Sequence, residues 1–275
     1  MRKVSIVVPT YNQARYLPIC LDSVWFQDYP DIEIVVVNDG SPDDTRQVLD
    51  AYVRAVETEE ASFASRYNEA TGHVERTTHL RYPPAGRSLV LLEHPANRGL
   101  SAALNTGFAA CTGELCTFIA SDDMLLPGMA GALAAALDES GADFAYADMH
   151  VVDDAGRILR RFALPDYTFE NAFCHWYLCG ICKLYKRELH EKHGWYREDV
   201  NPQDHEMFLR FAMAGARFVH VPRVLANVRI HGPERQVANH DAREWSRLFV
   251  QSKELVALAR RHAAALAGGG GGPAA

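Results

Sequence analysis

Short aliphatic runs alternate with segments of helical periodicity along the first 120 residues. Such runs are typical of strands buried on both faces, and they occupy residues 4–8, 32–37, 89–92 and 115–119. Apolar side chains recur at helical spacing between them, over residues 17–25, 41–57 and 100–110. Strand and helix in regular alternation predict an α/β fold, with a mostly parallel sheet flanked by helices.

The pattern changes after Asp123. Periodicity predicts helices over residues 125–137, 203–214 and 241–266, and strands over 144–147, 217–221 and 224–230. Val151-Val152 and the segment 158–162 flank Gly156, which predicts a hairpin. At the start of the second helix, Ser41 is the expected N-cap.

Two segments interrupt this organisation. Residues 58–88 are polar, hold several glycines and prolines and lack a period, so we expect a surface insertion there. Residues 268–275 are glycine-rich and predict a flexible tail. Between them, residues 1–235 form one expected domain, with halves 1–123 and 124–235, followed by a helical extension over 236–267.

Composition narrows the function classes. The 275 residues are 48% hydrophobic and 23% charged, which is typical of a globular protein. The net charge is −7 and no basic block is interleaved with aromatics, so a nucleic-acid partner is not expected. No run approaches the roughly 20 apolar residues of a spanning helix, and residues 4–8 are too short for a signal peptide, which predicts a cytoplasmic protein.

Six cysteines are too sparse for a disulfide scaffold in a chain of this length. Cys179 and Cys182 have the spacing of a redox or zinc pair, with Cys174 nearby. A redox pair opens a helix directly after a strand in a thioredoxin-like unit, which this chain does not resemble. We therefore favour buried free thiols over a metal or redox site.

Candidate chemistry lies after the predicted parallel strands, where open sheets bind their ligands. No glycine-rich dinucleotide or phosphate loop follows the first strand. Asp122 and Asp123 follow the fourth strand, and an anion beside them would need a divalent cation, Mg²⁺ or Mn²⁺. Asp39 can accept the ring N–H of uracil or thymine, and Tyr11 can stack on the base. These residues predict a nucleoside diphosphate and a metal at the strand ends.

Six motifs together resemble family 2 glycosyltransferases of the GT-A fold, over residues 1–232. They are Val-Ser-Ile-Val-Val-Pro-Thr-Tyr-Asn, Val-Asn-Asp-Gly-Ser-Pro-Asp, Asn-Arg-Gly-Leu-Ser and Ser-Asp-Asp, then Gln-Asp-His-Glu-Met-Phe-Leu-Arg at 203–210 and Arg-Ile-His-Gly at 229–232. The resemblance implies inverting transfer of a sugar from a UDP- or dTDP-type donor to a saccharide or glycoconjugate hydroxyl, with a divalent metal. Bacterial polysaccharide or glycoconjugate synthesis is the expected setting.

The resemblance also implies residue roles. Asp204 matches the general base, and Asp122 and His231 match metal-binding positions. Trp176 and Asp123 are expected on the acceptor side, where Asp123 also caps the next helix. The implied nucleotide-binding residues are Pro9, Thr10, Tyr11, Asp39, Asn97, Gly99 and Ser121.

Two positions depart from the family pattern. Ala120 stands where the family commonly has the first carboxylate of the metal turn, and Gln203 replaces the glutamate before the base. Ala120 keeps open the alternative of a catalytically weak nucleotide-sugar-binding module. A sugar-phosphate nucleotidyltransferase would need a glycine-rich basic loop at residues 9–12, which is absent.

The C-terminal helix allows three interpretations. It can pack on the domain, form a dimer, or contact the inner face of a membrane as a peripheral element. Its acidic and basic residues are mixed, so membrane contact is the least favoured of the three.

Overall fold

The computed structural model describes residues 1–175, 177–231 and 242–269. The first part of the chain forms β1 (Val4–Thr10), α1 (Leu17–Trp25), β2 (Ile32–Asn38), α2 (Thr45–Thr58), β3 (Glu60–Asn68), β4 (His73–Leu80), β5 (Arg87–Glu93), α3 (Leu100–Ala110) and β6 (Leu115–Phe118). The second part forms β7 (Met124–Leu125), α4 (Met129–Ser140), β8 (Phe144–Val152), β9 (Ile158–Phe162), η1 (Glu170–Cys174), β10 (Lys183–Lys186), α5 (Glu188–His193), α6 (Gln203–Met213), β11 (Phe218–Arg229) and α8 (Ala242–Gly269).

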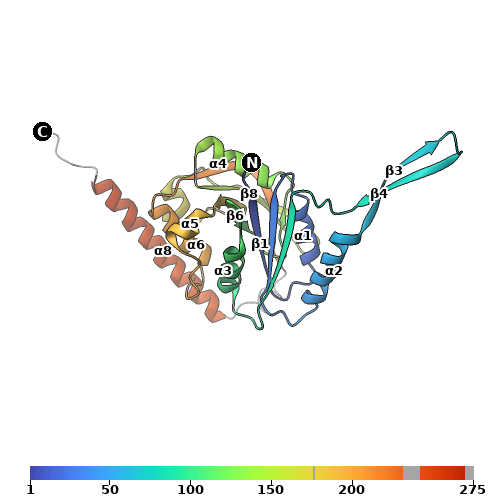
Figure 1. The fold of residues 1–275 in the computed structure, drawn as a ribbon. Coiled ribbons are helices and arrows are strands. Elements are labelled where there is room, and N and C mark those ends of the chain that lie inside the picture. Colours follow the sequence, from blue (N-terminus) through green and yellow to red (C-terminus); the bar gives the residue numbers. More distant parts are fainter. Residues whose placement is uncertain (176, 232–241, 270–275) are drawn as a thin grey trace.

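Four parallel strands form the core of the sheet, in the order β5-β2-β1-β6. Every residue of β1 and β2 is buried, as their aliphatic composition predicts. The chain moves outward from β1 through β2 to β5 and then returns to β6, so right-handed crossovers place α1 and α2 on one face and α3 on the other. Figure 1 shows this three-layer arrangement. The predicted α/β architecture is confirmed.

The second half extends the same sheet through β10, β8, β11 and β7. β10 is antiparallel to both of its neighbours, while β8 and β11 run parallel. We predicted two strands at 217–221 and 224–230, but the structure has one strand with a register shift between Val221 and Val224. Pro222 lies at this shift, where a residue without an N–H is tolerated, and the strand continues past it.

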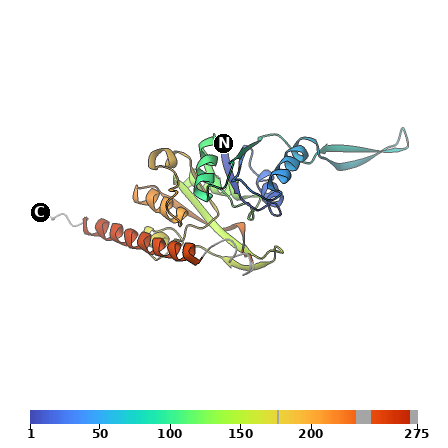
Figure 2. The same cartoon turned by 90° about the horizontal axis from the view of Figure 1, so that it is seen from below.

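The expected surface insertion contains regular structure. β3 and β4 pair antiparallel as a hairpin, and β5 starts at Arg87, two residues before the predicted strand. All eight residues of β4 are exposed, so the apolar periodicity that would have predicted these strands is absent. Figures 1 and 2 both show the hairpin projecting from the body, at the end opposite α8.

Two helix starts differ from the predictions. Residues 124–125 form β7, paired with β11, and the following helix starts at Met129 with Gly128 before it, so Asp123 does not cap it. Leu125 thus belongs to β7, and Pro127 lies in the turn between β7 and α4. Likewise, α2 starts at Thr45, because the Ser41 hydroxyl accepts the N–H of Asn12 at 3.1 Å instead of capping a helix. The hairpin at Gly156 is confirmed, with φ 79°.

α8 packs against η1 and α6, with Val256 and Ala259 buried. It extends through Gly268 and Gly269, which we had assigned to the tail. Residues 236–241 of the expected extension, residues 270–275 of the tail and Trp176 lie outside the described residues. No helix in the described part of the chain is both long and apolar enough to cross a bilayer.

Removing the hairpin should leave the fold intact. We expect replacement of residues 61–79 by a short glycine linker to change the melting temperature by no more than about 2 °C, because exposed side chains contribute little to stability. Glu59 and Arg81 already close the base, with the Arg81 N–H donating to the Glu59 carbonyl at 2.7 Å. Thermal unfolding measures the change.

Tyr82→Ala is the matched control, since Tyr82 is only 3% exposed and packs edge-on against Trp25. It should cost about 3–5 kcal/mol, the usual range for truncating a buried aromatic side chain. A hairpin deletion as damaging as this truncation would show that the hairpin is part of the core.

Candidate active site

The strand register brings the predicted residues to one edge of the sheet. β1 lies between β2 and β6, and Thr10 is paired with Asn38 while Val7 is paired with Phe118. Residues that follow these three strands therefore emerge side by side, at the point where the strand order reverses. Tyr11, Asp39 and the turn 120–123 all lie at this edge.

Asp39 is the anchor of the loop that follows β5. Its carboxylate is 3% exposed and accepts the N–H groups of Arg98 and Gly99, both at 2.9 Å. Its Oδ1 also contacts Nδ1 of His94 at 2.6 Å. The Asn97 side chain supports the same turn, with Oδ1 accepting the Gly99 N–H at 2.9 Å. Asp39, Asn97 and Gly99 are thus brought together, and their contact with a nucleotide stays a prediction.

The end of β1 offers both buried and exposed groups. Pro9 is buried, and the Thr10 hydroxyl, 2% exposed, has no hydrogen-bond partner among the described residues. Tyr11 is 41% exposed, so its ring is free to stack on a planar group. Ser121 is buried at the neighbouring strand end. A buried hydroxyl without a partner is unusual, and a ligand at this edge could provide one.

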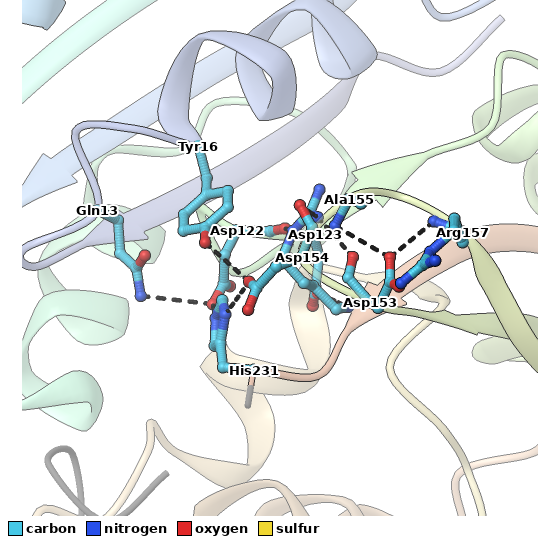
Figure 3. A network of polar contacts seen from close by, with 10 residues as sticks. Gln13, Tyr16, Asp122, Asp123, Asp153, Asp154, Ala155, Arg157 and His231 are labelled. Atoms are coloured by element: carbon cyan, nitrogen blue, oxygen red, sulfur yellow. Dashed lines mark hydrogen bonds and ion pairs between the residues drawn. The ribbon is translucent and has the colours of Figure 1, made fainter. Parts of the chain in front are cut away.

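Asp122 and His231 meet although 109 positions separate them in sequence. His231 Nε2 lies 2.8 Å from Asp122 Oδ2, and its Nδ1 lies 2.7 Å from Asp154 Oδ1. Tyr16 donates its hydroxyl to the same Asp154 oxygen at 2.8 Å. Figure 3 shows the imidazole held between the two carboxylates, with the Tyr16 ring beside it. Two residues predicted as metal ligands are therefore neighbours.

Arg229 fastens this network to the rest of the sheet. Its backbone N–H donates to Asp123 Oδ1 at 2.7 Å and its Nε to the Asp122 carbonyl at 3.0 Å. Asp123 is 5% exposed, and burial, with the Asp122 charge as a second cause, raises its pKa to about 8. The Asp123 carboxylate thus anchors the end of β11 through the Arg229 N–H. Its expected place on the acceptor side stays a prediction.

The donor set fits a metal ion whose remaining coordination positions are filled by a bound ligand. Asp122 and His231 supply one carboxylate and one imidazole, both of which Mn²⁺ accepts. Asp154 holds the other ring nitrogen of His231, as carboxylates commonly do behind metal-binding histidines. Within residues 1–175, 177–231 and 242–269, no three His, Cys, Asp or Glu side chains are grouped so as to hold a metal by themselves. Diphosphate oxygens and water would have to supply the rest.

Asp204 lies in the first turn of α6, as predicted, and both of its oxygens have partners. Lys183 Nζ lies 3.2 Å from Oδ2, and the Tyr196 hydroxyl donates to Oδ1 at 3.0 Å. The side chain is 21% exposed, so it remains reachable from solvent.

The neighbours of Asp204 on α6 are committed to other contacts. Glu206 forms a two-pronged ion pair with Arg210 at 2.9 and 3.0 Å. His205 is 3% exposed and stacks near Tyr177, and burial lowers its pKa to about 4. Asp204 is therefore the carboxylate of this turn that is partly exposed and not paired with an arginine among the described residues.

All six cysteines are buried and free. Burial raises the pKa of the Cys182 thiol to about 12, and that of Cys179 is raised for the same reason. Protonated, inaccessible thiols match the interpretation as structural residues.

Several site residues could not be identified from the sequence. His94, Asp154, Lys183 and Tyr196 contact the predicted residues, and the first three lie 55, 77 and 21 positions from their partners along the chain. Asp154 was interpreted only as part of a turn. Lys183 does carry a signal, because a lysine preceded by Cys182 and followed by Leu184 and Tyr185 occupies a position that should be buried.

The fold and this edge site define an α/β protein whose polar groups gather at the carboxyl ends of parallel strands. Residues 5–74 and 81–194 match the model of Glycosyl transferase family 2. The match covers more than half of the chain, and the chain belongs to this family. The gap between the two matched segments falls within β4, in the projecting hairpin.

The curated relatives of this chain are longer proteins. Glycosyltransferase GlyA of Streptococcus pneumoniae serotype 4 is 29% identical over 171 residues, which are 62% of this chain and 20% of that protein. Chondroitin synthase of Escherichia coli is 23% identical over 261 residues, 92% of this chain and 32% of that protein. The chain spans about a fifth to a half of the length of the curated relatives it matches.

Solved structures support the fold. S. aureus TarS 1–349 in complex with UDP-GlcNAc has a TM-score of 0.67 and 21% identity, covering 94% of this chain and 66% of that chain. Mannosyltransferase PcManGT from Pyrobaculum calidifontis, in complex with GDP-Man and Mn²⁺, has a TM-score of 0.61 and 21% identity, covering 99% and 77%. The expected GT-A-type fold is confirmed.

The buried His205 should make stability depend on pH. Its pKa is about 4 in the folded chain, below the ordinary value of 6.5, so the unfolded chain takes up the proton first as the pH falls. The stability that this group contributes is present above pH 6.5 and is lost between about pH 6.5 and 4, by about 3 kcal/mol.

His205→Phe keeps an aromatic ring beside Tyr177 but removes the titration, so its unfolding free energy should fall less over this range. Urea unfolding at a series of pH values measures the difference. Parallel curves for the two proteins would show that His205 is not buried in the neutral form.

Proposed function

We propose that this chain is an inverting glycosyltransferase, moving a sugar from a UDP- or dTDP-type donor to a hydroxyl of a saccharide or glycoconjugate. The single observation that carries the proposal is the pairing of Asp122 with His231 at the strand ends of a family 2 chain. Asp204, on α6, is a separate carboxylate that is partly exposed to solvent. Separate groups are thereby available for the leaving diphosphate and for the attacking hydroxyl.

The nucleotide is assigned to the ends of β1, β2 and β5. Tyr11 is exposed for stacking, and the unpartnered Thr10 hydroxyl is a candidate contact. Asp39 Oδ2 accepts only the Gly99 N–H among the described contacts, which leaves lone-pair capacity for the ring N–H of a uracil or thymine. Pro9, Asn97, Gly99 and Ser121 complete the pocket in this assignment.

A divalent cation, when bound, would neutralise the negative charge that develops on the departing nucleoside diphosphate. Asp122 and His231 would hold it, and Asp154 would keep the His231 ring oriented. The binding of Mn²⁺ by the mannosyltransferase neighbour supports this choice of metal. Ala120 contributes no ligand, so we expect the cation to bind together with the nucleotide rather than before it.

Asp204 is assigned the role of general base. The acceptor oxygen attacks the anomeric carbon from the side opposite the diphosphate, a carbon–oxygen bond forms, and the bond to the diphosphate breaks. The hydroxyl proton passes to a carboxylate oxygen of Asp204, and the electron pair of the broken bond leaves on the nucleoside diphosphate. One displacement inverts the anomeric configuration.

A catalytically weak nucleotide-sugar-binding module is the second candidate, and Ala120 is the observation that favours it. Metal-dependent hydrolysis of the donor in the absence of acceptor separates the two. A module without catalytic power would bind the nucleotide-sugar and leave it intact.

The biological setting is proposed from the relatives. The similarity to two chondroitin synthases supports a polysaccharide or glycoconjugate acceptor. We place the protein in the cytoplasm, where nucleotide-sugars are made, with peripheral membrane contact or dimerisation through α8 as predictions. The exposed Phe249 and Val250 on α8 support an external contact of either kind.

Binding of UDP should require the metal. At ten to a hundred times the dissociation constant, UDP with Mn²⁺ should raise the melting temperature by about 3–10 °C, and UDP in excess chelator should not. Asp122→Asn should abolish this stabilisation, because the remaining His231 cannot offset the diphosphate charge. Asp50→Asn is the control, since that exposed carboxylate pairs only with Arg46 among the described residues. Equal stabilisation in chelator would remove the metal from the proposal.

Asp204→Asn should lower turnover by about 10²–10⁴-fold, because the amide keeps the shape of the side chain but cannot take the acceptor proton. UDP affinity should stay near that of the unmodified protein. Stability will fall as well, since Lys183 loses its carboxylate partner, so turnover is measured on protein shown by circular dichroism to be folded.

Asp199→Asn is the matched control, an exposed carboxylate five positions earlier that pairs with Arg197. It should turn over normally. Near-normal turnover of Asp204→Asn would rule this residue out as the base.

A further inference from the structure

Lys183 is a buried cation that the proposed chemistry does not use. Its side chain is 0% exposed, although lysine is almost never fully buried without a partner. It extends from β10 with its ammonium 3.8 Å from the centre of the Phe118 ring. The only other polar contacts described for it are Asp204 Oδ2 at 3.2 Å and the Ile181 carbonyl at 3.5 Å.

Asp204 is the carboxylate that balances this charge. Asp123 also lies near Lys183, but its Oδ1 accepts the Arg229 N–H at 2.7 Å, and no hydrogen bond between Asp123 and Lys183 is found among the described residues. The thiols of Cys179 and Cys182 lie near Lys183 as well, and burial raises their pKa values so that they stay neutral. A buried ammonium without a counter-charge costs several kcal/mol. Asp204 therefore supplies the counter-charge of Lys183.

The remaining groups around Asp204 are neutral. Tyr196 donates its hydroxyl to Asp204, and Tyr177 and Tyr185 lie near enough to feel its charge. Burial raises the pKa of all three phenols. On α6, the Glu206 charge is paired with Arg210. Lys183 is thus the one cation that the described residues place in direct contact with Asp204.

We propose that Lys183 is a positioning residue for the general base: its ammonium group and the Tyr196 hydroxyl together fix the orientation of the Asp204 carboxylate toward the acceptor hydroxyl. The inference rests on the proposed role of Asp204. Lys183 on Oδ2 and Tyr196 on Oδ1 pin both oxygens. The remaining lone pairs on these oxygens can still receive a proton from the exposed side.

This arrangement has a consequence for turnover. A catalytic group that is already held in the productive orientation does not have to be ordered when the reaction occurs. Loss of Lys183 should therefore slow the transfer step and leave nucleotide binding unchanged.

Lys183→Met replaces the ammonium by an apolar chain of similar length beside Phe118. UDP release from UDP-hexoses, assayed with Mn²⁺, should slow by about 10²-fold in Lys183→Met, because the base is no longer held in place, while UDP affinity stays unchanged. In an Asp204→Asn background the same substitution should not lower the rate further, because the group that Lys183 positions is already lost.

Lys186→Met is the matched control, because Lys186 lies on the same strand and pairs with Asp143 at 2.7 Å instead. It should change neither the rate of UDP release nor UDP affinity. If Lys183→Met does not fold, Lys183→Gln carries the same test with a polar neutral side chain.

An unchanged rate in Lys183→Met, or an equal loss in Lys186→Met, overturns the proposal. A merely structural ion pair would let Lys183→Met lower the rate of Asp204→Asn further as well, and that result also overturns it. Failure of the base assignment has a different signature: Asp204→Asn would turn over normally, whatever the rate of Lys183→Met.

Discussion

The pairing of β1 with parallel strands on both sides is the constraint on which the rest of the molecule depends. Hydrogen bonds to β2 and β6 fix β1 in register, and burial of all its side chains makes a register slip costly. Because the crossovers leave β1 in opposite directions, the strand ends open a gap at their carboxyl edge. Every candidate nucleotide contact lies at that edge.

A second constraint joins the two halves of the chain. Arg229, at the end of β11, donates from its backbone to Asp123 and from its side chain to the Asp122 carbonyl and to the Asp153 and Asp154 carbonyls. Its guanidinium also lies 4.8 Å from the Tyr16 ring centre. The turn at residues 120–123, the β8–β9 hairpin and the end of β11 are thereby held as one unit, which explains how His231 reaches Asp122.

The sequence predicted the parallel core, because aliphatic runs at strand spacing have few alternative interpretations. It also predicted that Tyr11, Asp39, Ser121 and Asp122 share one edge, since parallel strands end on the same side. It failed for the β3–β4 hairpin, whose exposed strands have no apolar face to create a period. It failed again at the start of α4, where β7 pairs with a strand about 100 residues further along the chain.

What the sequence determined by itself was the fold class, the family resemblance and the identity of the acidic residues at the strand ends, because local hydrophobic patterns and short motifs encode all three. Only the tertiary structure decided which partners those residues have. Asp154 behind His231, His94 beside Asp39 and Lys183 against Asp204 all come from segments far away in sequence. Such contacts depend on how the strands and turns are packed in space, and no local pattern records that.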